Sequence, residues 1–234
     1  MSIKQNTVEA ANSVDRIAHV HFQKETLMKT FNQVEIYENL KEIVDPSHTC
    51  LVVWDVQNGL VNHIFNKDVF LNSLRTLTET LRGKMPIVYT LITPLPQTYQ
   101  SGWNLSSMMK RFQITDPNKL PVFMAYGSPE REIPEAVKPQ AGDILLDKST
   151  PNIFLGTNFE LMMKNRGIKS LIFTGIATEI GVEHSARDAA ARGFYPVVVT
   201  DCVSSMNREA HERSLANLAR ITITAESKEI LGSL

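Results

Sequence analysis

The sequence predicts an α/β domain in which helices sandwich a central, mostly parallel sheet of about six strands, with an N-terminal helical extension. Two observations carry this prediction. Short runs rich in Val and Ile, apolar on consecutive positions, recur along the chain, and longer segments with helical spacing separate them. Strands buried on both faces show such runs and are usually parallel. Their alternation with helices implies right-handed crossovers that place helices on both sides of the sheet.

Each predicted element rests on its own pattern of apolar residues. The six strand-like runs lie at residues 51–54, 87–92, 144–146, 170–174, 196–200 and 221–224. Helical spacing predicts helices at residues 68–82, 158–165, 179–192 and 207–219. Gly167 and Gly193 follow two of these helices directly, where glycine commonly ends a helix.

Two regions fall outside this alternation. Residues 1–48 contain helical patterns and no apparent strand, which predicts a helical extension followed by the domain itself over residues 49–234. Residues 93–142 are rich in proline and aromatic residues and lack a regular pattern. Because a long irregular stretch inside a compact domain is usually functional, we expect a pocket cover or an oligomer contact there.

The composition is that of an ordinary globular chain. With 24 Lys+Arg and 25 Asp+Glu in 234 residues, the net charge is −1, which offers no field for a nucleic-acid backbone or an anionic membrane. Cys50 and Cys202 are too few for a disulfide scaffold, and no signal peptide or membrane span is apparent. These features predict a cytoplasmic protein whose partners are a small-molecule substrate and copies of itself.

Polar residues at the carboxyl ends of the predicted strands are the first site candidates, because ligands of open parallel sheets bind there. These ends carry Asp55, Lys148, the turn at 175–181 and Asp201. No Gly-x-Gly-x-x-Gly or Walker sequence follows a strand, which disfavours dinucleotides and nucleoside triphosphates. Asp55 follows the apolar Trp54, so burial should raise the pKa of its carboxyl and suit it to acid–base chemistry. A loop cap is the alternative role.

Two further features at this edge bear on Asp55. Lys148 follows a buried strand, where its ammonium could pair with Asp55 or stabilise a developing oxyanion, although a surface lysine is the commoner case. In the segment 174–189 a strand enters a glycine-containing turn and then a helix. The amides that begin such a helix point outward and can hold an anion, although many helices begin this way.

Together these motifs resemble the isochorismatase-like cysteine hydrolases, a family that includes nicotinamidases, N-carbamoyl-amide hydrolases and isochorismatases. The resemblance rests on Asp55 in Trp-Asp-Val-Gln, on Lys148 ahead of Asn-Ile-Phe and Gly-Thr, and on the 175–189 turn, and it covers roughly residues 48–225. It implies a three-layer α/β sandwich, an Asp–Lys–Cys triad and a cis peptide bond that would lie at Ile176–Ala177. It also places Gln57, Ile176, Ala177 and Thr178 against the substrate.

The sequence departs from this family pattern at the nucleophile. The residue that matches the catalytic cysteine is Gly181, and the two cysteines of the chain lie on other strands. Glycine here resembles the isochorismatases, which hydrolyse a vinyl ether without a covalent intermediate. The resemblance then implies Asp55 as general acid, Lys148 as its electrostatic partner, and more room for substrate beside Gly181. Residues that would contact isochorismate itself have no clear match, so we expect another small substrate bearing a carboxylate.

No cofactor or metal is expected. Zinc-binding relatives carry Asp-x-His and a further His after the second strand, and residues 93–99 hold neither residue type. His19 and His21 alone make a weak site. Two alternatives to the vinyl-ether hydrolase stay open. One is an inactive relative that binds a metabolite or a protein partner, and the other is an amide hydrolase that uses activated water in the space of the missing sulfur.

Overall fold

The computed structural model describes residues 29–234, which belong to two units, Met1–Ile36 and Tyr37–Leu234. The described part of the first unit is a β-hairpin in which β1 (Lys29–Phe31) pairs antiparallel with β2 (Val34–Ile36). Asn32 and Gln33 form its turn with φ of 49° and 67°, the left-handed values that a tight two-residue hairpin needs. The predicted helix is therefore wrong for residues 29–36, while residues 1–28 lie outside the described part.

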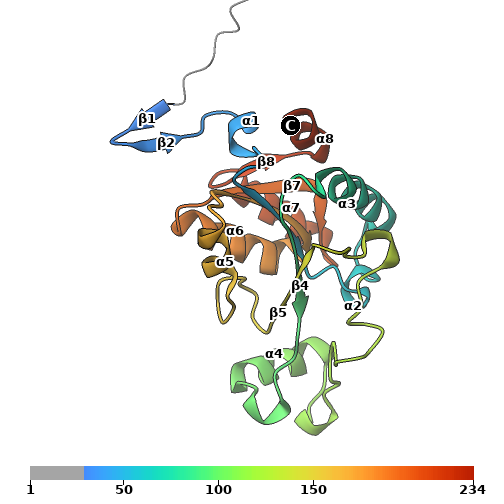
Figure 1. The fold of residues 1–234 in the computed structure, drawn as a ribbon. Coiled ribbons are helices and arrows are strands. Elements are labelled where there is room, and N and C mark those ends of the chain that lie inside the picture. Colours follow the sequence, from blue (N-terminus) through green and yellow to red (C-terminus); the bar gives the residue numbers. More distant parts are fainter. Residues whose placement is uncertain (1–28) are drawn as a thin grey trace, which may run out of the picture. The chain divides into compact units, whose positions relative to one another are not determined.

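The second unit is built on one six-stranded sheet with the order β5-β4-β3-β6-β7-β8, in which every neighbouring pair is parallel (Figure 1). The strands are β3 (Thr49–Trp54), β4 (Ile87–Ile92), β5 (Ile144–Lys148), β6 (Ser170–Ile176), β7 (Tyr195–Ser204) and β8 (Ile223–Ala225). Each contains or overlaps a predicted strand. The chain first adds strands on one side of β3 and then on the other, so the order reverses between β3 and β6. Ligand sites of parallel sheets lie at such a point.

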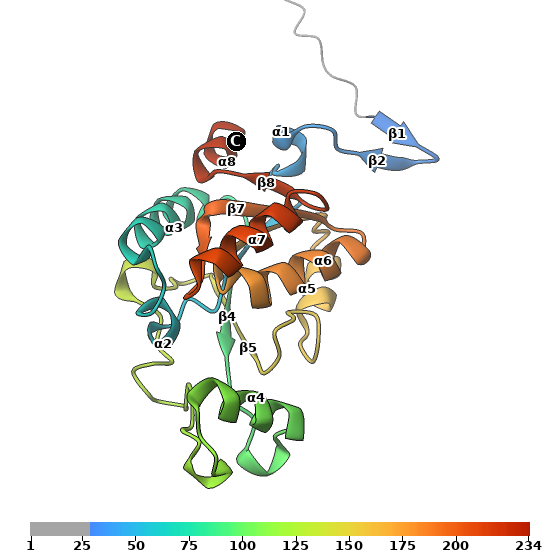
Figure 2. The same ribbon diagram turned by 180° about the vertical axis from the view of Figure 1, so that it is seen from behind.

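Helices cover both faces of the sheet, so the three-layer prediction is confirmed. The helices of the described residues are α1 (Leu40–Ile43), α2 (Asn58–Val61), α3 (Lys67–Leu81), α4 (Gly102–Phe112), α5 (Phe159–Asn165), α6 (Glu183–Ala191), α7 (Arg208–Leu218) and α8 (Ser227–Gly232), of which α4 does not pack on the sheet. Side chains of α3 and α8 pack on one face in a core that includes Leu51 and Val53. Side chains of α5, α6 and α7 pack on the other with Val52 and Trp54 (Figure 2).

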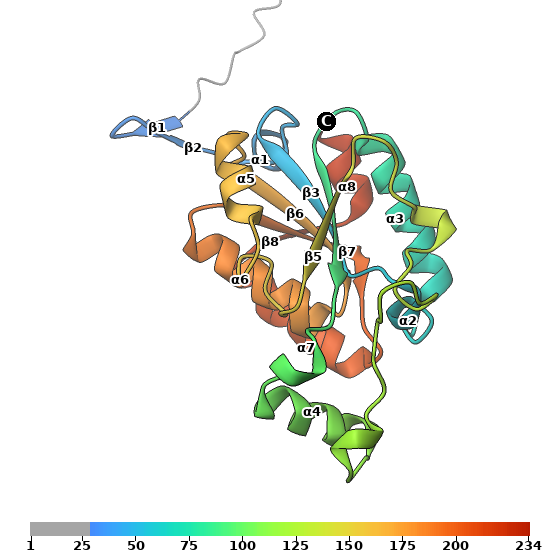
Figure 3. The same ribbon diagram turned by 60° about the horizontal axis from the view of Figure 1, so that its bottom comes forward.

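The predicted irregular segment, residues 93–142, leaves the sheet after β4 and returns before β5. It contains α4 and three single turns of 3₁₀ helix, η1 (Gln97–Tyr99), η2 (Pro117–Lys119) and η3 (Glu135–Val137). No residue of α4 is buried, and in all three views the part around α4 stands off the sheet (Figure 3). We call residues 95–126 the excursion.

The two cysteines and Asp201, which the sequence placed near strand ends, lie on β3 and β7. Cys50 and Cys202 are both free and buried. Asp201 was expected at a strand end, but β7 continues to Ser204, and the Asp201 carboxylate accepts hydrogen bonds from the backbone and hydroxyl of Ser227 at the start of α8. Among residues 29–234, no helix has the length and apolar character that a membrane crossing requires.

Candidate active site

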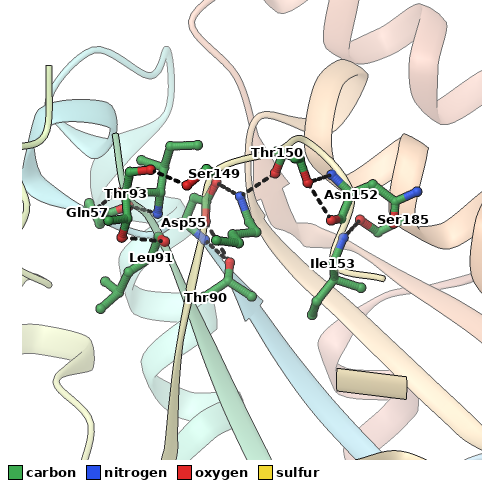
Figure 4. A network of polar contacts seen from close by, with 12 residues as sticks. Asp55, Gln57, Thr90, Leu91, Thr93, Ser149, Thr150, Asn152, Ile153 and Ser185 are labelled. Carbon is green, nitrogen blue, oxygen red and sulfur yellow. Dashed lines mark hydrogen bonds and ion pairs between the residues drawn. The ribbon is translucent and has the colours of Figure 1, made fainter. Parts of the chain in front are cut away.

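Three elements bring the predicted site residues to the carboxyl edge of the sheet. Asp55 follows β3 directly, Lys148 is the last residue of β5, and the turn after β6 begins at Ala177. Asp55 has a φ of 47°, a left-handed backbone that ends the extended strand there. Figure 4 shows a network of polar contacts that includes Asp55, residues of β4 and of the loop after β5, and Ser185 on α6.

Asp55 and Lys148 form a buried ion pair, as the sequence predicted. Lys148 Nζ lies 2.6 Å from Asp55 Oδ2. The side chain of Lys148 is 0% exposed, and that of Asp55 is 6% exposed. The Thr90 hydroxyl donates to Asp55 Oδ1 at 2.6 Å and accepts from the Asp55 backbone N–H at 3.0 Å. The carboxylate is therefore fixed from two sides, and its remaining exposure is the open side of the pair.

Burial moves both groups toward their neutral forms. Desolvation raises the pKa of Asp55 above its ordinary value, although the Lys148 ammonium and the Thr90 hydroxyl oppose this. Desolvation likewise lowers the pKa of Lys148, although Asp55 opposes it. A carboxyl with a raised pKa holds its proton more readily, and a lysine beside it stabilises the carboxylate once that proton has left. The geometry suits Asp55 to proton transfer.

Two other groups hold the Lys148 ammonium. Its Nζ donates to the Thr150 carbonyl at 3.2 Å, and it lies 3.9 Å from the centroid of the Trp54 ring, a cation–π distance. Thr150 belongs to the loop after β5, whose next residues are tied to α6 because the Ile153 N–H donates to the Ser185 hydroxyl. This loop keeps the lysine at the end of a rigid strand.

The turn after β6 has the backbone that the resemblance implied. The Ile176–Ala177 peptide bond is cis, and a five-residue π-helical turn, η4 (Thr178–Val182), leads into α6. The first N–H groups of a helix have no acceptor within that helix, so the Thr178 and Glu179 amides can serve a ligand oxygen. The Thr178 side chain bonds elsewhere, with the Ser204 carbonyl at 3.1 Å and His211 Nδ1 at 2.8 Å.

Two further predicted substrate contacts, Ile176 and Gln57, also have their side chains committed to the protein. Ile176 is 1% exposed and belongs to the hydrophobic core, so only its backbone faces the turn. Gln57 is fully buried and clamps two segments, because its Oε1 accepts from Ile92 N at 2.8 Å and its Nε2 donates to the Arg131 carbonyl at 3.1 Å. Gln57 thus holds the end of β4 to the returning irregular segment, and its predicted substrate contact stays untested. Ala177 keeps 9% exposure.

Gly181 lies in the π-helical turn, but the space beside it is not open. A Cβ built on Gly181 would lie 2.1 Å from Trp54 Nε1, 2.2 Å from Cε2 and 2.4 Å from Cζ2. The expectation of extra room for substrate is therefore wrong, because the edge of the Trp54 indole fills it. The same finding removes the basis for a water molecule in the place of the missing sulfur.

Trp54 and Thr90 are site residues that were not predicted from the sequence. Trp54 was noted only as the apolar residue before Asp55, and Thr90 was given no role. The register pairs Val53 with Tyr89 in the adjacent parallel strand, which places Thr90 beside the end of β3. Strand pairing would have been the signal for Thr90. No such signal exists for Trp54, because its contact with Gly181 depends on how β6 turns. Within the described part of the chain, no three His, Cys, Asp or Glu residues gather as a metal site, and His19 and His21 lie outside it.

Comparisons with known proteins identify relatives of this chain. Residues 49–229 match the model of the isochorismatase domain. The uncharacterized isochorismatase family protein YwoC of Bacillus subtilis is 39% identical over 177 residues, with 74% of this chain and 86% of YwoC covered. The ureidoacrylate amidohydrolase RutB of Methylobacterium radiotolerans is 26% identical over 193 residues, with 75% of this chain and 74% of RutB covered.

Solved structures share the fold. A cysteine hydrolase from Pseudomonas syringae pv. phaseolicola superposes with a TM-score of 0.69 at 18% identity, over 82% of this chain and 96% of the other. An isochorismatase-like hydrolase from Alkaliphilus metalliredigens gives 0.66 at 19% identity, over 80% and 98%. The family match and the YwoC likeness establish that this chain belongs to the isochorismatase family and is a hydrolase of that family.

Proposed function

We propose that the protein hydrolyses a small, carboxylate-bearing vinyl ether without a covalent enzyme intermediate, with Asp55 as the general acid. The observation that carries this proposal is the buried Asp55–Lys148 pair beside a residue, Gly181, that offers no nucleophilic side chain. Position 181 provides no thiol for a covalent reaction, whereas Asp55 and Lys148 provide a carboxyl and an ammonium that suit proton transfer.

The reaction begins with a proton transfer to carbon. The Asp55 carboxyl donates its proton to the terminal carbon of the enol ether, and the electron pair of the C=C bond forms the new C–H bond. An oxocarbenium ion and the Asp55 carboxylate result. Water then adds to the cationic carbon, and its released proton returns to Asp55. The hemiketal collapses to a carbonyl compound and an alcohol, so one water is consumed and the acid is regenerated.

Lys148 and the turn amides supply the electrostatic part. Lys148 Nζ, 2.6 Å from Asp55 Oδ2, stabilises the carboxylate that exists while the oxocarbenium ion is present. The amides at the start of η4 offer a place for the substrate carboxylate. This assignment uses the backbone of the turn and needs no side chain of residues 176–178.

A substrate panel tests the proposal. We would measure wild type and Asp55→Asn with 2-ethoxyacrylate, which hydrolyses to pyruvate and ethanol, and with ureidoacrylate and nicotinamide as amides. We expect pyruvate release by the wild type and a loss of at least about 100-fold in Asp55→Asn, the scale of general acid catalysis. Vinyl-ether turnover that survives the substitution overturns the role of Asp55.

The same panel separates the two alternatives. Amide hydrolysis has support from the relative named ureidoacrylate amidohydrolase. Turnover of amides in place of 2-ethoxyacrylate would favour it, with Asp55 acting on a water outside the space that the indole fills. A purified, folded protein that turns over no member of the panel would favour the relative that only binds a metabolite or partner.

A further inference from the structure

The indole of Trp54 and Gly181 fit together so closely that position 181 has no room for a side chain while the indole is present. Real Cβ atoms do not approach other atoms within 3.0 Å, and a Cβ on Gly181 would meet three indole atoms at 2.1–2.4 Å. These three atoms, Nε1, Cε2 and Cζ2, form one edge of the ring system. The ring edge therefore occupies the first position that any side chain of residue 181 would need.

Trp54 cannot easily withdraw from this position. It is 1% exposed and packs in the core that α5, α6 and α7 cover. Its backbone is paired with Gly175 on β6, where a Cβ would lie 2.0 Å from the Trp54 carbonyl oxygen and where φ is 112°. Gly175 near the end of β6 and Gly181 in the turn that follows thus accommodate one tryptophan, Gly175 at its backbone and Gly181 at its side chain.

The same ring touches the reacting pair. Lys148 Nζ lies 3.9 Å from the ring centroid and 2.6 Å from Asp55 Oδ2. A cation over an aromatic face is stabilised as a cation, which works against the burial that lowers the pKa of Lys148. Trp54 therefore lies between the ammonium on its face and Gly181 at its edge.

We propose that Trp54 determines the reaction class of this site: its indole takes the place of a nucleophilic side chain at position 181 and confines the site to chemistry without a covalent intermediate. The inference rests on the proposed function for the location of the reaction, but its test needs no turnover of the unknown substrate. It predicts that Gly181→Cys alone cannot provide a working thiol, whereas Trp54→Val together with Gly181→Cys can.

The first part of the test is a double-mutant cycle of stability, since only residues in contact show coupling. Thermal midpoints are measured for Trp54→Val, Gly181→Ala and the double variant. We expect alanine at 181 to lower the midpoint by about 5 °C or more in the wild-type background, and by much less beside Trp54→Val. Gly102→Ala is the matched control, because a Cβ there meets nothing within 4 Å. Equal losses in both backgrounds overturn the inference.

The second part traps the covalent intermediate with p-nitrophenyl acetate. The introduced thiolate attacks the acetyl carbonyl, the ester C–O bond breaks, and p-nitrophenolate leaves with the electron pair while the thiol proton passes to solvent. We expect a burst of one nitrophenolate per chain and an acetyl adduct at position 181 in Trp54→Val/Gly181→Cys. Wild type gives the background, because burial leaves Cys50 and Cys202 at 0% exposure and raises their pKa values.

The stability and acylation experiments can overturn the role of Trp54 independently of the result of the substrate panel. A burst in Gly181→Cys alone, equal to that of the double variant, shows that the indole does not close the position and overturns the inference. Failure of the double variant to acylate while its midpoint matches that of Trp54→Val overturns it as well. If the wild type turns over no vinyl ether but the double variant acylates and the cycle shows coupling, the proposed function fails and the role of Trp54 stands.

Discussion

A charged residue of a different ion pair lies at each end of strand β5, Asp143 just before its first residue and Lys148 as its last, and the two pairs behave in opposite ways. At its amino end, Asp143 accepts from Arg82 Nη2 at 2.9 Å and from the Gln140 N–H at 2.8 Å. At its carboxyl end, Lys148 meets Asp55. Burial acts to lower the pKa of Arg82, but Asp143 and Tyr89 raise it overall. At the Asp55 pair burial prevails, and both partners move toward neutrality.

The difference teaches what each pair is built for. Arg82 also donates to the Tyr89 hydroxyl at 3.2 Å, so its guanidinium is spread over several acceptors and keeps its charge. Such a pair fastens α3 to the start of β5. The Lys148 cation of the Asp55 pair is fully buried, and desolvation prevails there over the attraction between the charges, which favours transfer of a proton. We call the Arg82–Asp143 pair the support pair and the Asp55–Lys148 pair the site pair.

The largest expected difference is in activity. Lys148→Met should reduce kcat/KM for 2-ethoxyacrylate by at least about 100-fold, the scale on which a preorganised charge contributes to catalysis. Arg82→Met removes the cation of the support pair and should leave kcat/KM within about threefold at a temperature where the variant is folded. Steady-state kinetics of both variants give the comparison. A similar loss in the two would show that the site pair has no special part in the reaction.

The next difference is in stability. Replacing a buried ion pair by neutral groups is often neutral or stabilising, by about 1–4 kcal/mol, because no charge then has to be desolvated. We expect this for Asp55→Asn/Lys148→Met in urea unfolding. Arg82→Met/Asp143→Asn should instead lose about 2 kcal/mol, because its hydrogen bonds to Tyr89 and within the pair disappear. If the site-pair double variant is the less stable of the two, the pair serves structure.

The pH dependence sharpens the comparison further. A general acid works in its protonated form, so kcat/KM should be level at low pH and fall about tenfold per unit as the pH rises through the folded pKa of Asp55, which lies above 3.8. A raised pKa also means that the contribution of Asp55 to stability is greatest below 3.8 and is lost as the pH rises through the folded value.

Tyr89, which accepts a hydrogen bond from Arg82 of the support pair, responds in the alkaline range. Burial raises the pKa of Tyr89 to about 12 from 10, so the contribution of Tyr89 to stability is lost as the pH rises from about 10 through about 12. Unfolding midpoints of wild type, Asp55→Asn and Tyr89→Phe across pH separate the two effects. An acid limb that rises with pH in the kcat/KM profile would contradict Asp55 as proton donor.

The sequence predicted the sheet well because buried parallel strands are apolar at every position. The run at 87–92, for example, coincides with β4. It failed at residues 29–36, where Phe31 and Val34 are exposed and a turn at Asn32–Gln33 decides the structure. Local apolar spacing carries little information about a short hairpin whose residues do not enter a core.

In the candidate site too, the residues at strand ends could be predicted from the sequence, whereas contacts that depend on turns could not. Asp55 and Lys148 were predicted to meet because strand ends of one sheet share an edge, and a strand fixes where its last residue lies. The contact of Trp54 with Gly181 could not be predicted. It depends on the path of the chain after β6 and on the face of the sheet on which the Trp54 indole lies. Gln57 lies past the end of β3, and its clamp on Ile92 and Arg131 joins segments far apart in sequence.

The smallest expected effect on chemistry lies in the excursion, away from both pairs. Trp103 on α4 is 81% exposed, with Tyr99 at 77% and Tyr126 at 69%. Aromatic residues are enriched in subunit contacts, and the sequence allowed an oligomer contact in this segment, so we propose that copies of the chain associate through it. Trp103→Glu should reduce the molar mass found by light scattering to that of one chain. Val69→Glu on α3, where Val69 is 65% exposed, is the matched control and should leave it unchanged.

This experiment also decides between the two roles that the sequence allowed for residues 93–142. If the excursion is a subunit contact, Trp103→Glu changes the mass and leaves kcat/KM within about twofold, because no residue of α4 is buried. If it covers the pocket, the mass stays the same and kcat/KM falls. A wild type that is monomeric at every concentration would exclude the subunit contact. The excursion would then have to act through Arg131 and Gln57, where the irregular segment rejoins the end of β4.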